Sequence, residues 1–336
     1  MSKLRLTLAC TNYDRVRPIE DGRVQPLGID LIYLRLHSQA IFLRMLKYHE
    51  FDVAELSFAK YVLSLFEENP PFIAIPAFPS RMFRHAAIYV SRKSGIRNPK
   101  DLVGKRVGVP EYDQTAGVWI RGMLAEEYNV PVASVNYHAG RVKDEKYEGT
   151  HYTNLSSLDV VPNKPGIRVE PIGKGKNLSQ MLMDDEIDAI YSAGAPPSFV
   201  DNPESVERLF PNCKKVEEDY FRKTRIFPIM HVFAIKKEVY DQNRWIAKSL
   251  YDAFLKAKQL ALDELLNSNG VCLYMLPWLH EEIDSTTNVM GKDYWPYGIS
   301  ANEKTVGRFL TYLFDQGLIP RKREPREIFA AETIAT

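Results

Sequence analysis

The fold of this chain is decided at residues 76–90, which read PAFPSRMFRHAAIYV. Apolar runs rich in β-branched and aromatic residues lie on both sides of a connection that two prolines punctuate, and both runs predict strands. The connection carries Arg81, Arg84 and His85 where a loop leaves a sheet. Ligands bind at such places in open α/β sheets, and clustered guanidiniums favour a carboxylate. This stretch alone leaves open an alternative to a ligand site, namely a solvated basic loop whose charges pair with nearby acidic residues.

Length and charge set the outer limits of the prediction. A chain of 336 residues exceeds what one core usually supports, so we expect two lobes. Its 44 basic and 43 acidic side chains nearly cancel, which argues against a nucleic-acid partner. The sequence contains no apolar run of membrane-spanning length, so we expect no membrane partner. The first residues lack an apolar signal segment, and we therefore expect a cytoplasmic protein.

The three cysteines are Cys10, Cys213 and Cys272. They are odd in number, far apart and in no C-x-x-C pair, so they indicate neither a disulfide framework nor a zinc site. We interpret them as buried free thiols.

Strand and helix patterns alternate along the chain, and two predicted strand ends carry polar groups. Residues 4–9 predict a strand, and the loop CTNYDRVRP that follows it contains Asn12, Asp14 and Arg15. Residues 106–109 predict a buried strand that ends in PEYDQT, before a helix over residues 116–128. Loops at such strand ends are where we look for ligand contacts.

Three polar residues lie in that second loop, Glu111, Asp113 and Thr115. Carboxylates there serve as bases or as acceptors for ligand hydroxyls. Thr115 either binds an anionic group at the helix start or caps the helix, and capping is the simpler interpretation.

A second segment resembles the first in kind. Residues 223–235 read KTRIFPIMHVFAI, again an Arg, a Pro and a His before an apolar strand. Two such segments far apart in sequence are what two crossovers between lobes look like. For both His85 and His231, two interpretations remain open: a core histidine whose polar atoms are hydrogen-bonded, or a functional histidine. The aromatic loop DYWPYG at residues 293–298 either lines a ring-binding cleft or packs against the last helices.

Several segments together resemble the 4,5-dihydroxyphthalate decarboxylase family. They are TNYDR (11–15), FDVAELS (51–57), FPSRMFRH (78–85), GKRVGVPEY (104–112), WIRG (119–122), IFPIMH (226–231) and WPYG (295–298), which together span nearly the whole chain.

This resemblance implies an α/β, two-lobed type II periplasmic-binding-protein-like fold. Each lobe is a mixed sheet flanked by helices, and two crossovers join them. Lobe one is expected at residues 1–88 and 229–336, lobe two at residues 89–228, and the ligand cleft between them. Hinge closure around the ligand is expected of such lobes.

The resemblance also implies non-oxidative decarboxylation of an aromatic dicarboxylate. The expected reaction converts 4,5-dihydroxyphthalate to 3,4-dihydroxybenzoate (protocatechuate) and carbon dioxide, in phthalate degradation. One ring hydroxyl is para to each carboxylate, so carbon dioxide can leave after protonation of the carbon that bears it. That chemistry needs no organic cofactor; it needs cations for the second carboxylate, a proton donor and acceptors for the hydroxyls.

We assign these roles as a hypothesis. Arg15, Arg81 and Arg84 clamp carboxylates, and His85 or His231 is the acid. Glu111 or Asp14 accepts hydrogen bonds from the catechol hydroxyls. Further substrate contacts are expected from Asn12, Asp113 and Thr115.

Two other functions remain open at this stage. A solute-binding protein for an aromatic carboxylate would do no chemistry, but it would need no histidine pair. A metal-assisted decarboxylase would use His85, His231 and a carboxylate as ligands, although no close ligand spacing supports a metal. The oligomeric state is open, a homo-oligomer included.

Overall fold

A computed structural model describes residues 3–143, 162–267 and 274–336. The chain forms two compact units, each with its own sheet. Unit 1 comprises Met1–Arg81, Glu218–Val306 and Glu324–Thr336, and unit 2 comprises Met82–Glu217 and Gly307–Arg323. The expected boundaries lay at residues 88 and 228, with all of the later residues in lobe one. In the structure residues 307–323 pack in unit 2 instead.

The sheet of unit 1 has the strand order β2-β1-β3-β11-β4. Its strands are β1 (Leu4–Cys10), β2 (Ile29–Arg35), β3 (Val53–Ser57), β4 (Phe72–Arg81) and β11 (Ile229–Lys236). β1 runs parallel to β2 and β3, whereas β11 is antiparallel to β3 and β4. The sheet is therefore mixed, as the resemblance implied.

Strand β4 is longer than the sequence predicted. The two prolines at positions 76 and 79 lie inside it, where a connection was expected. β4 stands at the end of the strand order, and an edge strand tolerates residues that lack an N–H donor. Its pairing with β11 is irregular on either side of His231, which lies opposite Ser57 of β3 and Ser80 of β4.

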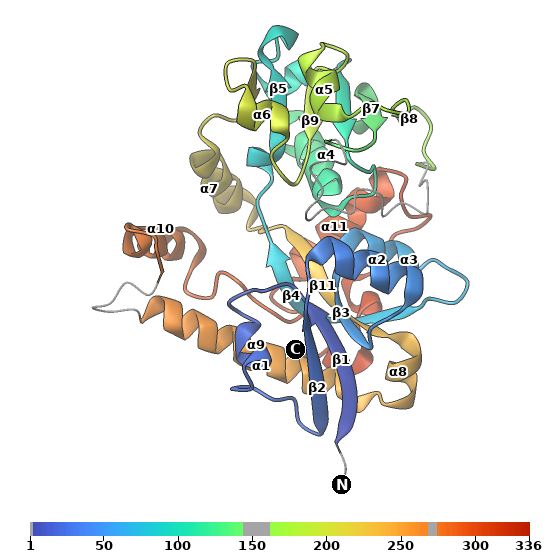
Figure 1. The fold of residues 1–336 in the computed structure, drawn as a ribbon, viewed down its shortest axis with the longest axis vertical. Helices are drawn as coiled ribbons and strands as arrows, with labels where there is room; N and C mark the ends of the chain where they lie inside the picture. The colour runs from blue at the N-terminus through green and yellow to red at the C-terminus, as the bar shows by residue number, and fades with distance from the viewer. Residues whose placement is uncertain (1–2, 144–161, 268–273) are drawn as a thin grey trace. The chain divides into compact units, whose positions relative to one another are not determined.

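Helices of different lengths accompany the sheet in unit 1, and α10 stands away from the strands (Figure 1). They are α1 (Arg17–Glu20), α2 (Ser38–Tyr48), α3 (Phe58–Ser64), α8 (Lys237–Gln242), α9 (Trp245–Leu266) and α10 (Leu279–Met290), and α11 (Glu303–Asp315) crosses into unit 2. The long α9 packs against α1 and β4. Phe254 of α9 stacks on Phe233 of β11 with the ring centroids 3.8 Å apart, and α2 packs against β3.

The sheet of unit 2 has the order β10-β5-β9-β6-β7-β8. Its strands are β5 (Ile88–Ser91), β6 (Arg106–Val109), β7 (Asn136–Ala139), β8 (Arg168–Pro171), β9 (Ala189–Tyr191) and β10 (Val206–Arg208). β5 is antiparallel to both of its neighbours, and the pairs from β9 to β8 are parallel. Residues 137–163 are polar and show little periodicity, a pattern that favours an irregular segment. The first of them nevertheless belong to β7, and residues 144–161 lie outside the described part.

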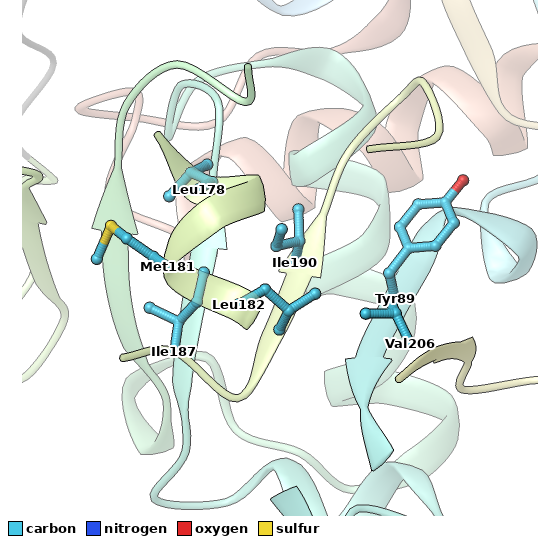
Figure 2. Close-up of a cluster of buried hydrophobic side chains, with 7 residues drawn as sticks. All are labelled: Tyr89, Leu178, Met181, Leu182, Ile187, Ile190 and Val206. Carbon is cyan, nitrogen blue, oxygen red and sulfur yellow. The ribbon is translucent and has the colours of Figure 1, made fainter. Parts of the chain in front are cut away.

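In the described part of unit 2, this sheet is accompanied by α4 (Thr115–Tyr128), α5 (Leu178–Met183), α6 (Pro197–Asp201) and α7 (Cys213–Thr224), which crosses into unit 1, and by the part of α11 from residue 307 on. Figure 2 shows the buried cluster between α5 and the sheet, made of Tyr89, Leu178, Met181, Leu182, Ile187, Ile190 and Val206. Residues 307–323 pack on α4. Trp119 stacks on Phe309 at 5.1 Å, and a Cβ at Gly122 would lie 2.1 Å from the Tyr312 ring. Only glycine permits that close contact.

The cysteines differ from the interpretation as buried thiols. Cys10 is buried in β1, but Cys213 at the start of α7 is half-buried, and Cys272 lies outside the described residues. Within the described ranges, no helix is both long and apolar enough to span a membrane.

Candidate active site

Unit 1 holds a carboxylate in the middle of its sheet. Glu55 lies in β3, where every residue is buried, and its own side chain has no exposed surface. Its Oε2 accepts the backbone N–H of Thr11 at 2.9 Å and lies 3.7 Å from the sulfur of Cys10. Its Oε1 accepts the Tyr13 hydroxyl at 2.6 Å and lies 2.5 Å from Nδ1 of His231. β1, β3 and β11 are adjacent strands, which is why these residues meet.

These contacts decide the charge of Glu55. Burial by itself would raise its pKa, but the hydrogen bond and charge of His231, then the Tyr13 and Thr11 donors, lower the pKa to about 2. Burial, reinforced by Glu55, raises the pKa of Tyr13 and also that of Cys10. Glu55 is therefore an anion at neutral pH, and of its partners His231 is the one that can carry a positive charge.

His231 is held in one orientation. Its side chain is 19% exposed, and its ring meets Phe42 of α2 edge-on with the centroids 4.9 Å apart. Because Nδ1 is engaged by Glu55, Nε2 is the nitrogen left to exchange a proton with a ligand. A carboxylate that fixes an imidazole in this way also stabilises its protonated form.

Arg15 lies beside this pair of residues. Its Cζ is 4.3 Å from the ring centroid of Tyr13 and 4.1 Å from that of Trp295. Its Nε donates to the carbonyl of Pro79 at 2.6 Å, and its Nη1 donates to Asp14 at 2.9 Å. Tyr13 thus contacts the guanidinium with its ring and Glu55 with its hydroxyl. One tyrosine therefore contacts both a group that can hold a carboxylate and the pair of residues that can deliver a proton.

The other predicted residues of the first loop lie close to Arg15 in the chain. Asp14 has a side chain that is 42% exposed, and its Oδ1 accepts both the backbone N–H and the Nη1–H of Arg15. Asn12 is exposed. The structure therefore shows Asp14 as a partner of Arg15.

Arg81 is buried in unit 1 and contacts oxygens of the protein itself. Nη1 donates to the carbonyl of Phe227 at 3.0 Å, and Nη2 donates to the carbonyl of Pro296 at 2.8 Å and to the side chain of Asn302. Burial lowers its pKa to about 9. These bonds tie segments of unit 1 together, whereas a carboxylate clamp was expected.

Arg84 and His85 belong to unit 2. Burial lowers the pKa of Arg84 to about 10, and its Nη1 lies 3.4 Å from the carbonyl of Ala193. His85, in the 3-10 helix His85–Ala87, packs against Phe210 at 5.2 Å, and its Nδ1 is 3.8 Å from the Glu217 carboxylate. Burial lowers the pKa of His85 to about 4, so its ring is neutral near pH 7. The geometry favours His231 over His85 as the acid.

The predicted residues at the start of α4 also belong to unit 2. Glu111 is half-buried, and Asp113 and Thr115 are buried. The predicted cap at Thr115 is wrong, because Gln114 occupies the N-cap position and Thr115 is already helical. Unit 1 brings together Asp14, Arg15 and His231 from the predicted set, and the three residues at the start of α4 are described within unit 2 alone.

Sequence reasoning assigned no role to Glu55 or Tyr13, although both lie in segments that carried the family resemblance. The loop of Trp295 was left open between lining a ring-binding cleft and packing against the last helices, and no contact with Arg15 was expected. One signal was present at Glu55: a charged residue in an otherwise apolar, buried strand pattern is costly unless it is paired.

A metal-assisted reaction would need a cluster of metal ligands. Among the residues that the structure describes, no three His, Cys, Asp or Glu side chains are grouped so that they could hold a metal ion.

Comparisons with known proteins agree on the family. No protein-family model matches the chain. The 4,5-dihydroxyphthalate decarboxylase of Comamonas testosteroni is 35% identical over 330 residues, covering 98% of this chain and 97% of the relative. That of Pseudomonas putida is 35% identical over 222 residues, covering 66% and 83%.

Among solved structures, the periplasmic sulfonate-binding protein SsuA of Methylobacillus flagellatus KT aligns with a TM-score of 0.54 at 12% identity. The alignment covers 100% of this chain and 94% of that one. At this identity the match shows the fold alone, which is the expected periplasmic-binding-protein-like fold. The family itself is shown by the two relatives at 35% identity: this chain belongs to the 4,5-dihydroxyphthalate decarboxylase family.

Proposed function

We propose that this chain is a carboxy-lyase that converts 4,5-dihydroxyphthalate to 3,4-dihydroxybenzoate and carbon dioxide, a step of phthalate degradation. The family supplies the reaction. One observation assigns the chemistry to particular residues: buried Glu55 contacts Nδ1 of His231 at 2.5 Å.

The proton is delivered by His231. Its Nδ1–H is held by the Glu55 carboxylate, so the imidazolium donates from Nε2 to the ring carbon that bears the departing carboxylate. The para hydroxyl oxygen feeds electrons into the ring during this step. The bond from the ring carbon to the carboxylate then breaks, carbon dioxide leaves, and its electron pair restores the aromatic ring. Water returns a proton to His231, so one proton is consumed for each carbon dioxide released.

The second carboxylate is held by Arg15. Two hydrogen bonds within the protein hold the guanidinium, one from Nε to the carbonyl of Pro79 and one from Nη1 to Asp14. The remaining N–H groups suit a carboxylate. Because Tyr13 contacts Arg15 with its ring and Glu55 with its hydroxyl, it links the group that holds the anion to the pair that delivers the proton. Proximity of this kind lowers the barrier without a cofactor.

The deciding experiment uses purified protein treated with a chelator. It is incubated with 4,5-dihydroxyphthalate, and carbon dioxide and 3,4-dihydroxybenzoate are followed, with His231→Gln as the matched inactive variant. Equal amounts of both products from the wild type, and none from the variant, support the proposal. Binding without product supports a solute-binding protein, and activity that returns only with added metal supports a metal-assisted decarboxylase. Either of the last two results overturns this mechanism.

A further inference from the structure

The aromatic segment at residues 294–297 is anchored along the edge of β4. Nε1 of Trp295 donates to the carbonyl of Phe78 at 2.8 Å, and the N–H of Gly298 donates to the carbonyl of Pro76 at 2.8 Å. The carbonyl of Pro79 accepts from Arg15 in the same way. An edge strand leaves carbonyl groups available to other partners, and these carbonyls bind the site residues.

Two buried side chains hold the same segment from within unit 1. Nη2 of Arg81 and Nδ2 of Asn302 both donate to the carbonyl of Pro296, at 2.8 and 3.0 Å. Asn302 also donates to the carbonyl of Gly298 at 2.7 Å and is 1% exposed. Hydrogen bonds from a buried guanidinium are among the stronger ones in proteins. The segment therefore cannot move away from β4 without breaking several buried bonds.

This anchoring fixes a ring against Arg15. The ring centroids of Trp295 and Tyr13 lie 4.1 and 4.3 Å from the same guanidinium carbon, well within the range of cation–π contacts. Arg15 therefore contacts two aromatic rings at once, which restricts the orientations that its guanidinium can take. Of the five N–H donors of an arginine, the bonds to Pro79 and Asp14 use one on Nε and one on Nη1. The hydrogen bonds that Arg15 makes to other described residues therefore leave one N–H on Nη1 and both on Nη2 for a ligand.

We propose that Trp295 is a positioning residue that fixes the plane of Arg15, so that the site selects a planar carboxylate bound end-on, and that Arg81 and Asn302 serve to hold Trp295. The inference rests on the role of Arg15 in the proposed function. It gives Arg81 an indirect part in carboxylate binding, in place of the direct contact that its sequence context suggested. Selectivity then depends on a side chain that need not touch the reacting carbon.

The test is a double-mutant cycle read by calorimetry. The probe is phthalate, which has both carboxylates but lacks the para hydroxyl that the reaction needs. Trp295→Leu removes the stacked ring and is expected to weaken phthalate binding about three- to thirty-fold, as loss of a cation–π contact does. Trp295→Phe keeps an aromatic face and should stay within about threefold of the wild type. Trp278→Leu is the matched control, since Trp278 is 68% exposed in the same unit.

The decisive comparison is made in an Arg15→Ala background. If Trp295 acts through Arg15, Trp295→Leu has no further effect there, because the partner is gone. A merely structural role predicts the same loss in both backgrounds, and that result overturns the inference, as does wild-type affinity in Trp295→Leu alone. In turnover of 4,5-dihydroxyphthalate, KM should rise with little change in kcat, the pattern of lost uniform binding.

Phthalate binding does not depend on turnover, so the role of Trp295 and the proposed function can be refuted independently of each other. A protein that binds phthalate in a Trp295-dependent manner but releases no carbon dioxide from 4,5-dihydroxyphthalate overturns the proposed function and leaves this inference intact. The thermal midpoint of each variant is measured alongside. An unfolded Trp295→Leu protein is replaced by Asn302→Ala, which loosens the segment without changing the ring and is expected to show the same dependence on Arg15.

Discussion

Replacing Glu55 by glutamine tests the central contact of the site. The substitution keeps the shape of the side chain but removes its charge. The carboxylate accepts hydrogen bonds from Thr11 and Tyr13 and faces Nδ1 of His231. An amide has a single acceptor oxygen, so it cannot satisfy all of these donors. Glu55→Gln should therefore reduce both the stability of unit 1 and the turnover of the enzyme.

The size of the effect follows from the pKa of Glu55, which falls from its ordinary value of 4.5 to about 2 in the folded chain. At about 1.36 kcal/mol for each pKa unit, the native contacts favour the charged form by about 3 kcal/mol. Since the folded pKa is the lower one, this stability is fully present above pH 4.5 and is lost as the pH falls toward 2. The gap in unfolding free energy between wild type and Glu55→Gln should therefore shrink on acidification.

In the proposed mechanism, the same carboxylate orients His231 for proton transfer through its contact with Nδ1. Removing its charge should lower kcat about tenfold or more, within the range that general acid catalysis contributes. The assay combines urea unfolding at pH 7 and at a more acidic pH with the initial rate of carbon dioxide release by the folded variant. Glu217→Gln is the matched control, because this carboxylate lies 3.8 Å from His85 in unit 2. A folded Glu55→Gln enzyme that keeps more than about a third of kcat, or a Glu217→Gln enzyme that loses as much, refutes the assignment.

Three further substitutions separate the roles. Tyr13→Phe removes the donor to Glu55 but keeps the ring on Arg15, so fluorescence titration should show unchanged phthalate affinity while kcat falls about tenfold; a weaker affinity contradicts this. Arg15→Lys loses the fork and should raise KM by about tenfold or more in steady-state assays, and an unchanged KM would exclude Arg15 as the clamp. His85→Ala should lower the free energy of unfolding by about 2–4 kcal/mol, measured in urea, with kcat of the folded protein within about twofold. A hundredfold loss of kcat in that variant would return the acid role to His85.

Most strands of the fold could be predicted from the sequence, because alternating or continuous apolar runs decide which residues are buried. β4 is the instructive exception. Pro76 and Pro79 predict the end of a strand by local rules, but an edge position removes the penalty for a missing donor. Whether a strand lies at an edge depends on the order of all strands in the sheet. In this sheet β11 lies between β3 and β4 and so leaves β4 at the edge, although β11 comes far later in the chain.

The candidate site was only partly predictable for a similar reason. His85 and His231 occupy matching local sequences, each with an Arg and a Pro before it and an apolar strand after it. What separates them is their partners: Phe210 and burial for His85, and Glu55, 176 residues away in the chain, for His231. Local sequence carries no information about such distant partners. Arg15 was identified correctly as part of a polar loop at a strand end, but the rings that stack on it were not.

The buried carboxylate is also an argument for an enzyme rather than a receptor. A protein that only binds an aromatic dicarboxylate needs cations such as Arg15, and a second negative charge near the ligand opposes binding. Taking Glu55 out of water is costly, and the cost is offset only by its donors and by a positive partner. This arrangement has no evident use in a site that only binds an anion, whereas the proposed proton transfer from His231 makes use of it. If the chain were a receptor, Glu55→Gln would leave phthalate affinity unchanged or tighter and no turnover would exist to lose.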